Sequence, residues 1–149
     1  MKRTTRITAI ILIIVSMLCQ FGFAANAAVY EMSGKAQQVV SQVNAERAAR
    51  GLKTLRVDAA LTAAARTRAY EIVKKFSHTR PDGTKWRTVS NLAYGENIAR
   101  GQQTADKVIA AWLTSDGHRA NILRSGFGSI GVCCVKAGNV YYWVQLFGK

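Results

Sequence analysis

The spacing of apolar residues changes once along this chain, and that change restricts the fold more than any other feature of the sequence. In the segments expected to form helices between residues 33 and 123, apolar side chains recur at intervals of three and four, which is the period of an amphipathic helix. Beyond residue 126 the interval becomes two, with Ile130, Val132 and Cys134 alternating with their neighbours. Gly138-Asn139 then supplies a turn before a return strand at 140–147. An isolated hairpin is unstable in water, so it must pack on the helices, and the pattern predicts an α+β fold.

Four helices are expected before the hairpin. Ser33, Asp58 and Thr104 are placed to cap the first three, and a short fourth helix is expected over residues 119–123. Between the second and third helices, the segment from 81 to about 101 has no period and opens with a Pro-Asp-Gly turn signal. We expect an irregular loop there.

The first 27 residues have the three parts of a secretory signal. Basic residues at positions 2, 3 and 6 precede an apolar run at 7–18, and small residues then stand at Ala25 and Ala27. The apolar run is too short for a membrane span, which needs about 20 residues. We therefore expect cleavage after Ala27, a short lead at 28–34, one domain at 35–149, and a secreted, monomeric product.

Positive charge is the main feature of the composition. The formal net charge is +13, and removing the three basic residues of the signal leaves +10. Such a field favours polyanions. However, the basic residues are scattered and do not alternate with aromatics, so a nucleic-acid partner is not expected. Two interpretations stay open: a solvated basic surface, or peripheral association with anionic envelope polymers or acidic lipids.

The cysteines do not predict a disulfide scaffold. Cys19 lies in the signal, which leaves Cys133 and Cys134 side by side. Neighbouring residues on a strand point to opposite faces, and a bond between them lies outside normal disulfide geometry. Both are expected to pack in the core as small apolar side chains.

Only three residues suggest chemistry. The chain has two histidines, His78 and His118, and Glu96 lies between them in the sequence. Imidazole and carboxylate are ligands of zinc-like divalent ions, so these residues are candidates for a metal or acid–base cluster. The competing interpretation is two surface histidines, with Glu96 bracing its loop through backbone amides.

Four motifs in register resemble the CAP superfamily, the cysteine-rich secretory, antigen 5 and pathogenesis-related proteins, in its short bacterial form. They read FSH at 76–78, GENIA at 95–99, WLTSDGHRANIL at 112–123 and YWVQLFG at 142–148. The run VNAER at 43–47 is similar to the first helix of the family. The resemblance covers about residues 35–149.

The resemblance implies an α-β-α sandwich with a small antiparallel sheet and a shallow central cavity. It also implies that His78, Glu96 and His118 lie on the cavity floor, where some members hold a divalent metal. Ser115 stands where many animal and plant members have a second Glu, so three protein ligands are expected here. Asp116 stands where bacterial members often have Pro.

Two functions from different classes follow. The favoured one is a secreted, non-enzymatic module that binds a lipid, an envelope polymer or a protein. The alternative is a metal-dependent hydrolase that uses the same cluster, with Asp82 or Asp116 as general base. A related question is left open by the aromatic residues, which either line a ligand groove or pack in the core: Trp86, Tyr94, Trp112 and Trp143.

Overall fold

The structure, a computed structural model, describes residues 28–149. The predicted signal at 1–27 lies outside the described residues, so its cleavage stays a prediction. In chain order the elements are β1 (Val29–Glu31), α1 (Ser33–Ala48), β2 (Arg56–Val57), α2 (Ala59–Lys74), the 3-10 helix η1 (Trp86–Val89), β3 (Gly95–Arg100), α3 (Ala105–Leu113), α4 (Asp116–Ile122), β4 (Ser129–Ala137) and β5 (Val140–Gly148). Within the described part of the chain, no helix has the length and hydropathy needed to cross a membrane.

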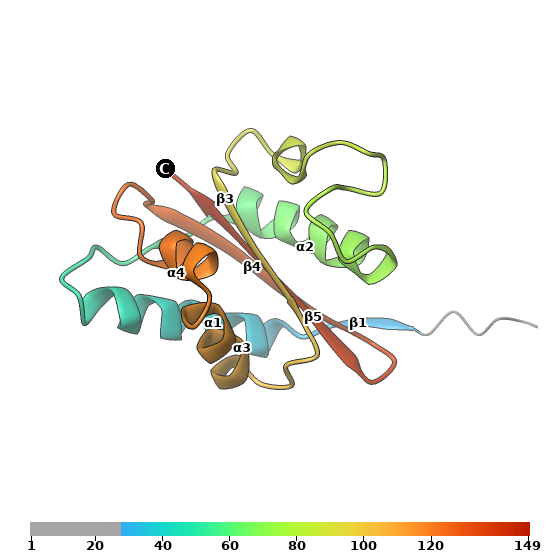
Figure 1. Ribbon diagram of the computed structural model, residues 1–149, viewed down its shortest axis with the longest axis horizontal. Coiled ribbons are helices and arrows are strands. Elements are labelled where there is room, and N and C mark those ends of the chain that lie inside the picture. Colours follow the sequence, from blue (N-terminus) through green and yellow to red (C-terminus); the bar gives the residue numbers. More distant parts are fainter. Residues whose placement is uncertain (1–27) are drawn as a thin grey trace, which may run out of the picture.

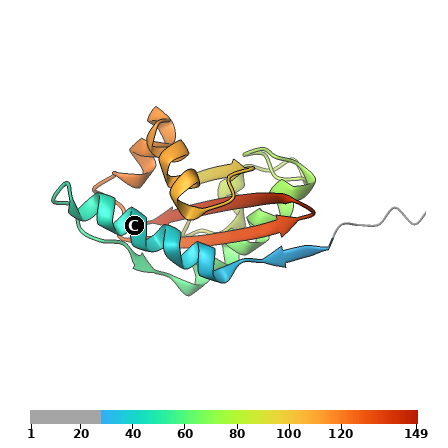
Figure 2. The same cartoon turned by 90° about the horizontal axis from the view of Figure 1, so that it is seen from below.

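The elements form three layers (Figure 1). The central sheet has the order β1-β4-β5-β3, and β2 pairs with the same strand as β1. All pairings are antiparallel except that of β2 with β4. Helix α2 and η1 pack on one face, while α1, α3 and α4 pack on the other (Figure 2). The predicted α+β class and α-β-α sandwich are confirmed.

The alternation predicted for β4 divides the core in two. Val132 and Cys134 face the layer of α1 and α3, whereas Cys133 and Val135 face α2. Both cysteines are buried and free, as expected. Burial raises the pKa of each thiol to about 12, so neither forms an appreciable amount of thiolate at neutral pH.

Most predicted helix ends are close to those observed. Asp58 caps α2 by accepting from the N–H groups of Ala60 and Leu61, and Thr104 caps α3. The prediction that Ser33 caps α1 is wrong. Met32 occupies the cap position, and the side chain of Met32 makes no capping bond. Helix α4 begins at Asp116, before the predicted residue 119, and therefore contains His118.

The prediction of an irregular loop over 81–101 is also wrong, because this segment contains η1 and the six-residue strand β3. Strand β3 pairs with β5 along its whole length. Its first five residues are buried, polar Glu96 and Asn97 among them, so the sequence shows no alternation of apolar and polar residues. At the other edge, the residues predicted as a short lead contribute β1, which pairs with β4.

Gly131 allows α2 to approach the sheet closely. It lies on β4, and a Cβ atom added there would overlap the backbone of Leu61 and Thr62 at the start of α2. Backbone cannot move aside as a flexible side chain can. Only glycine at this position lets α2 and β4 keep their packing distance.

We expect Gly131→Ala to lower the free energy of unfolding by about 1–3 kcal/mol or more, the range typical of overpacked cores. Urea unfolding of the purified protein measures this. The matched control is Gly34→Ala in α1, where an added Cβ meets nothing within 4 Å. That variant should be neutral or more stable by up to about 1 kcal/mol, since alanine favours helix. Equal stability of the two variants would contradict the close approach at Gly131.

Candidate functional site

A buried arginine organises the site. Arg68 lies on the inner face of α2 and is fully buried. Its Nε donates to Oε2 of Glu96 at 2.7 Å, and its Nη2 donates to Oε1 of Glu96 at 3.3 Å. Nη1 donates to Glu71 at 2.6 Å, and Nη2 also donates to the carbonyl of Ser77 at 2.8 Å. One guanidinium therefore joins α2 to β3 and to the segment that carries His78.

Glu96 uses both carboxylate oxygens inside this network. Its side chain has no exposed surface, and Oε1 also bonds Nδ1 of His78 at 2.8 Å. Because a carboxylate paired with a guanidinium acts as an acceptor, Nδ1 of His78 carries the proton and Nε2 is the free ring nitrogen. His78 is half exposed, with 53% of its side chain accessible. The partners of Glu96 are side chains, so bracing of the loop through backbone amides is not its role.

A second ion pair, between Arg80 and Glu71, lies beside the pair of Arg68 and Glu96. Arg80 donates to both oxygens of Glu71, with a shortest distance of 2.7 Å. Burial acts to raise the pKa of Glu71, but its hydrogen bonds to Arg80 and Arg68 outweigh burial and lower that pKa. The carboxylate is thus kept ionised, and the Arg80 loop is held against α2.

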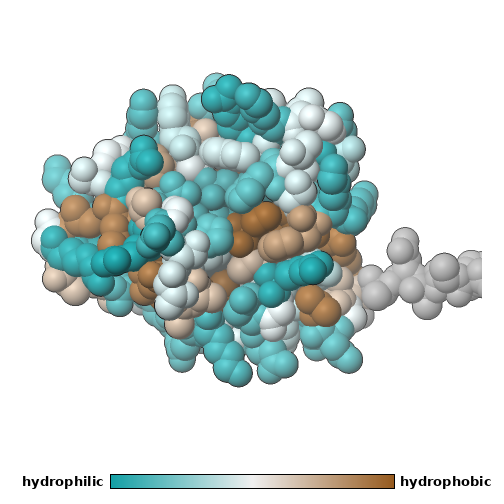
Figure 3. Space-filling model, viewed as in Figure 1, coloured by the Kyte–Doolittle hydropathy of each residue, from teal (hydrophilic) through white to brown (hydrophobic). Residues whose placement is uncertain are grey.

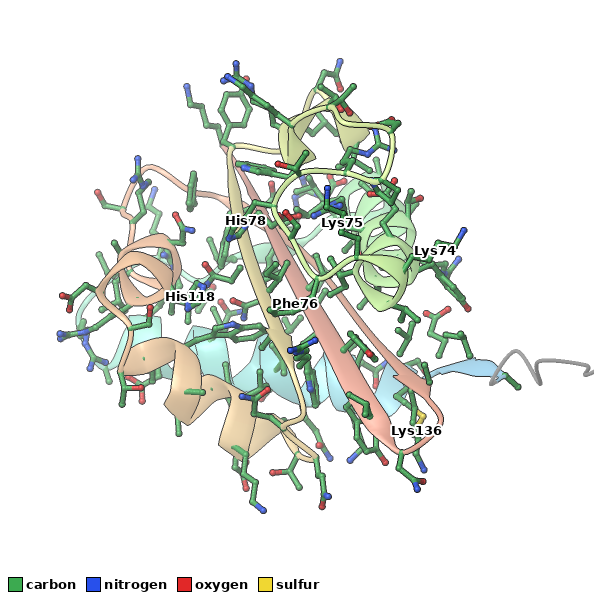
Figure 4. The ribbon with its side chains drawn as sticks, turned by 45° about the vertical axis from the view of Figure 1, so that its right-hand side comes forward. Lys74, Lys75, Phe76, His78, His118 and Lys136 are labelled. Carbon is green, nitrogen blue, oxygen red and sulfur yellow. The ribbon has the colours of Figure 1, made fainter. Side chains whose placement is uncertain are left out.

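His118 approaches from the opposite layer, in the first turn of α4, and is half-buried. Figure 4 shows it on the α4 side of β3, with Phe76 on the other side. Hydrophobic residues gather in the middle of the face that carries β3, with hydrophilic residues around them (Figure 3). The cavity beside His118 has a volume of about 330 Å³ and is lined by Phe76, Ile98, Ala99, Arg100, Gln102, Ala111, Trp112, Ser115 and His118.

The motif at 112–123 fixes His118 by covering the outer edge of β3. Trp112 donates from Nε1 to the carbonyl of Ile98 at 3.3 Å, and Asn121 donates to the carbonyl of Glu96 at 3.2 Å. Asn97 donates to the carbonyl of His118 at 3.0 Å. An uncovered edge strand would be open to pairing with another chain. These side chains close the edge and hold α4 beside the strand of Glu96.

The structure thus brings His78 and Glu96 into contact and places His118 across β3 from them. Burial lowers the pKa of His118, and the charge of His78 lowers it further. Within residues 28–149, no three His, Cys, Asp or Glu side chains are grouped as metal ligands. Metal binding by His78, Glu96 and His118 stays a prediction.

Two other candidate residues lie at a helix start and in a turn. Ser115 occupies the cap position of α4, although its side chain makes no capping bond. Asp82 accepts from the backbone and hydroxyl of Thr84 in the exposed turn. The residue that sequence reasoning missed is Arg68. Its position continues the apolar stripe of α2, between Ala65 and Ile72, and a basic residue in such a stripe needs an acidic partner.

Comparison with known proteins gives a consistent result. The family described as "CAP: Cysteine-rich secretory protein family" matches residues 40–147. The curated protein YkwD of Bacillus subtilis (strain 168), described as uncharacterized, is 40% identical over 124 residues, which is 78% of this chain and 48% of that protein. The chain therefore spans about half the length of this relative.

Solved structures share the fold. An outer surface protein from Borrelia burgdorferi superposes with a TM-score of 0.72 at 22% identity, over 82% of this chain and 98% of that one. An extracellular protein with an SCP domain from Bacillus anthracis gives 0.68 at 25% identity, over 78% of this chain and 41% of that one. NaASP2, crystallised with Zn²⁺, superposes with a TM-score of 0.62 at 17% identity, over 79% of this chain and 80% of that one.

The lowered pKa of His118 predicts a pH dependence of stability. As pH falls below about 6.5, the unfolded chain takes up a proton that the native imidazole resists, so stability must fall with pH. Urea unfolding in metal-free buffer between about pH 7.5 and 5 measures this, and His118→Gln should show a smaller fall. NMR titration should give His118 a midpoint below the ordinary value, and His78→Gln should raise it. A His118 midpoint at or above about 6.5 would contradict the burial argument.

Proposed function

Because the chain belongs to the CAP family, we propose that it is a secreted binding module that holds its ligand in the cavity beside His118 and catalyses no reaction there. Its ligand is a lipid, an envelope polymer or a protein. The family match and the fold support the class of protein. The choice of binding over catalysis rests on the state of Glu96.

Glu96 is badly placed to act as a catalytic base. A general base needs a lone pair within hydrogen-bonding reach of the proton that it removes. Glu96 has a fully buried side chain, and its two oxygens already accept from Arg68 and His78. A substrate in the cavity would meet the imidazole of His118 and the apolar wall. These groups can bind and orient a ligand.

The histidines also support a proposed metal subsite. The engaged oxygens of Glu96 do not suit direct coordination of an ion, but a carboxylate that accepts from one ring nitrogen of a histidine is the usual support for metal binding at the other. His78 and His118 are therefore the residues that would hold a zinc-like ion, with Glu96 orienting His78. The ion would supply an open coordination position for a ligand donor.

Zinc titration by calorimetry tests this subsite. Wild-type protein should bind one ion weakly and reversibly, with an affinity that falls in acid because imidazolium cannot ligate a metal. His118→Ala should abolish the heat, and Glu96→Gln should weaken binding about 10–100-fold, as expected for an orienting group. Glu46→Gln on α1 is the matched control and should bind as wild type. Equal heats from wild type and His118→Ala would refute the subsite.

Secretion and envelope association complete the proposal. The predicted signal and the names of two structural relatives, an outer surface protein and an extracellular protein, support an extracellular location. Arg100 lines the cavity, with its guanidinium 5.0 Å from the Phe76 ring centroid, and Lys74 and Lys75 are exposed at the end of α2, just before Phe76. Figure 4 shows the lysines near the end of α2 that leads to Phe76.

Co-sedimentation with purified cell-wall material tests the association. Retention at low salt should be lost near 1 M salt, where the screening length shrinks to about 3 Å. The double variant Lys74→Gln/Lys75→Gln should be retained less than wild type. The control is the double variant Ala63→Gln/Thr67→Gln, whose two positions are exposed on the same helix. Retention that salt does not change would contradict an electrostatic association.

A further inference from the structure

A second cavity lies on η1 and on the segment that joins it to β3. It has a volume of about 520 Å³ and shares no lining residue with the cavity beside His118. One continuous stretch of chain forms it, so we call it the Trp86 cleft. Its lining residues are Trp86, Arg87, Thr88, Ser90, Asn91, Ala93 and Tyr94.

The Trp86 cleft separates the surface aromatics from the core aromatics. Trp112 and Trp143 are only 1% and 0% exposed and belong to the core. Trp86 is half-buried and packs with one side against the α2 layer, while Tyr94 is 51% exposed. The sequence left open whether the aromatic residues pack in the core or line a ligand groove. Trp112 and Trp143 pack in the core, and only Trp86 and Tyr94 can offer ring surface to a ligand.

The cleft is held in place at both ends. The Trp86 N–H donates to the carbonyl of His78 at 3.0 Å, and the Tyr94 N–H donates to the carbonyl of Phe147 at 2.8 Å. Between them, the Ala93 N–H donates to the carbonyl of Ser90 at 3.2 Å. A binding site whose backbone is already ordered loses less entropy when a ligand binds.

The polar side chains that line the cleft are the guanidinium of Arg87, the amide of Asn91 and the hydroxyls of Thr88 and Ser90. Arg87 and Asn91 are exposed, and within residues 28–149 their side chains have no hydrogen-bond partner. The ammonium of Lys149 lies 4.5 Å from the centroid of the Tyr94 ring. No Asp or Glu is among the described residues that line the cleft. An anionic ligand would meet the positive charges of Arg87 and Lys149 and no carboxylate side chain among the lining residues.

We infer that the Trp86 cleft binds an oligosaccharide that carries carboxylate groups. A pyranose ring has an apolar C–H face, which suits an aromatic side chain, and a rim of hydroxyl and amide groups, which suits Asn91 and Ser90. Arg87 and Lys149 would receive the carboxylate. This site goes beyond the proposed ligand cavity, and it rests on the proposed extracellular location only for contact with envelope glycans.

The shape of the cleft favours a sugar over a single-stranded nucleic acid. Such strands are bound in long basic grooves, where successive bases stack on several aromatic platforms. The Trp86 cleft is formed by one short segment and offers only the rings of Trp86 and Tyr94. An oligonucleotide is therefore included below as a competing ligand.

Calorimetry on the mature protein tests the inference with two tetrasaccharides. One has two N-acetylglucosamine–N-acetylmuramic acid repeats and carries two carboxylates; the other is neutral tetra-N-acetylchitotetraose. The acidic probe should bind more tightly. Tyr94→Ala should weaken its binding about tenfold, the size expected for loss of an aromatic contact. Tyr70→Ala, an exposed tyrosine of α2 outside the cleft, should bind as wild type.

Charge and fluorescence give independent readouts. Arg87→Gln should abolish the preference for the acidic probe, whereas Arg119→Gln, an exposed arginine of α4, should keep it. Binding should also change tryptophan emission through Trp86, since the other two indoles are buried, and Trp86→Phe should remove that change. Thermal unfolding of each variant verifies that it is folded.

Three results would overturn the inference: no binding of either tetrasaccharide, equal affinities for Tyr94→Ala and Tyr70→Ala, or tighter binding of an oligothymidine than of the acidic probe. His118→Ala separates this inference from the proposed function. It should leave binding of the acidic probe unchanged, because His118 does not line the Trp86 cleft. Loss of zinc binding with glycan binding retained would show that the two sites are independent.

Discussion

The buried ion pair between Arg68 and Glu96 is the interaction on which the site depends. Each side chain is fully buried, and a buried charge left without its partner typically costs about 3–5 kcal/mol. The pair is therefore maintained, and it holds together parts of the chain that are distant in sequence: α2, β3 and, through the carbonyl of Ser77, the start of the long segment before η1. The orientation of His78 follows from this pair, because Oε1 of Glu96 is the acceptor for its Nδ1.

The opposite layer is anchored to the same strand by neutral groups. Trp112 and Asn121 donate to outward carbonyls of β3, and Asn97 donates back to the carbonyl of His118. Strand β3 thus receives a charged contact on the α2 side and amide and indole contacts on the α4 side. This arrangement explains why an edge strand bearing Glu96 is buried without apolar alternation: its polar groups are satisfied by partners from both layers.

Sequence patterns predicted what depends on repeated, local rules. The period of two predicted the hairpin of β4 and β5, and side-chain caps predicted the starts of α2 and α3. Strand β3 was missed because its burial comes from specific partners that no local rule reveals. The same is true of Arg47, which continues the buried face of α1 after Val43. Its guanidinium is fully buried, and its partners are carbonyls of two separate segments, at Lys53 and at Ile122, Arg124 and Phe127.

The two buried arginines also explain how a domain without disulfides keeps its loops in place. Arg47 fastens the α4–β4 connection to α1, and Arg68 fastens the segment before η1 to α2. The second attachment extends further, because the Trp86 N–H donates to the carbonyl of His78, whose ring is held by Glu96. The backbone that carries Trp86 is therefore linked to the network around Glu96. A change at Glu96 that moved His78 would reach the Trp86 cleft through a single hydrogen bond, while Tyr94 would stay fixed to β5 through Phe147. The two aromatic walls of the cleft have separate supports, one from the ion-pair network and one from the sheet.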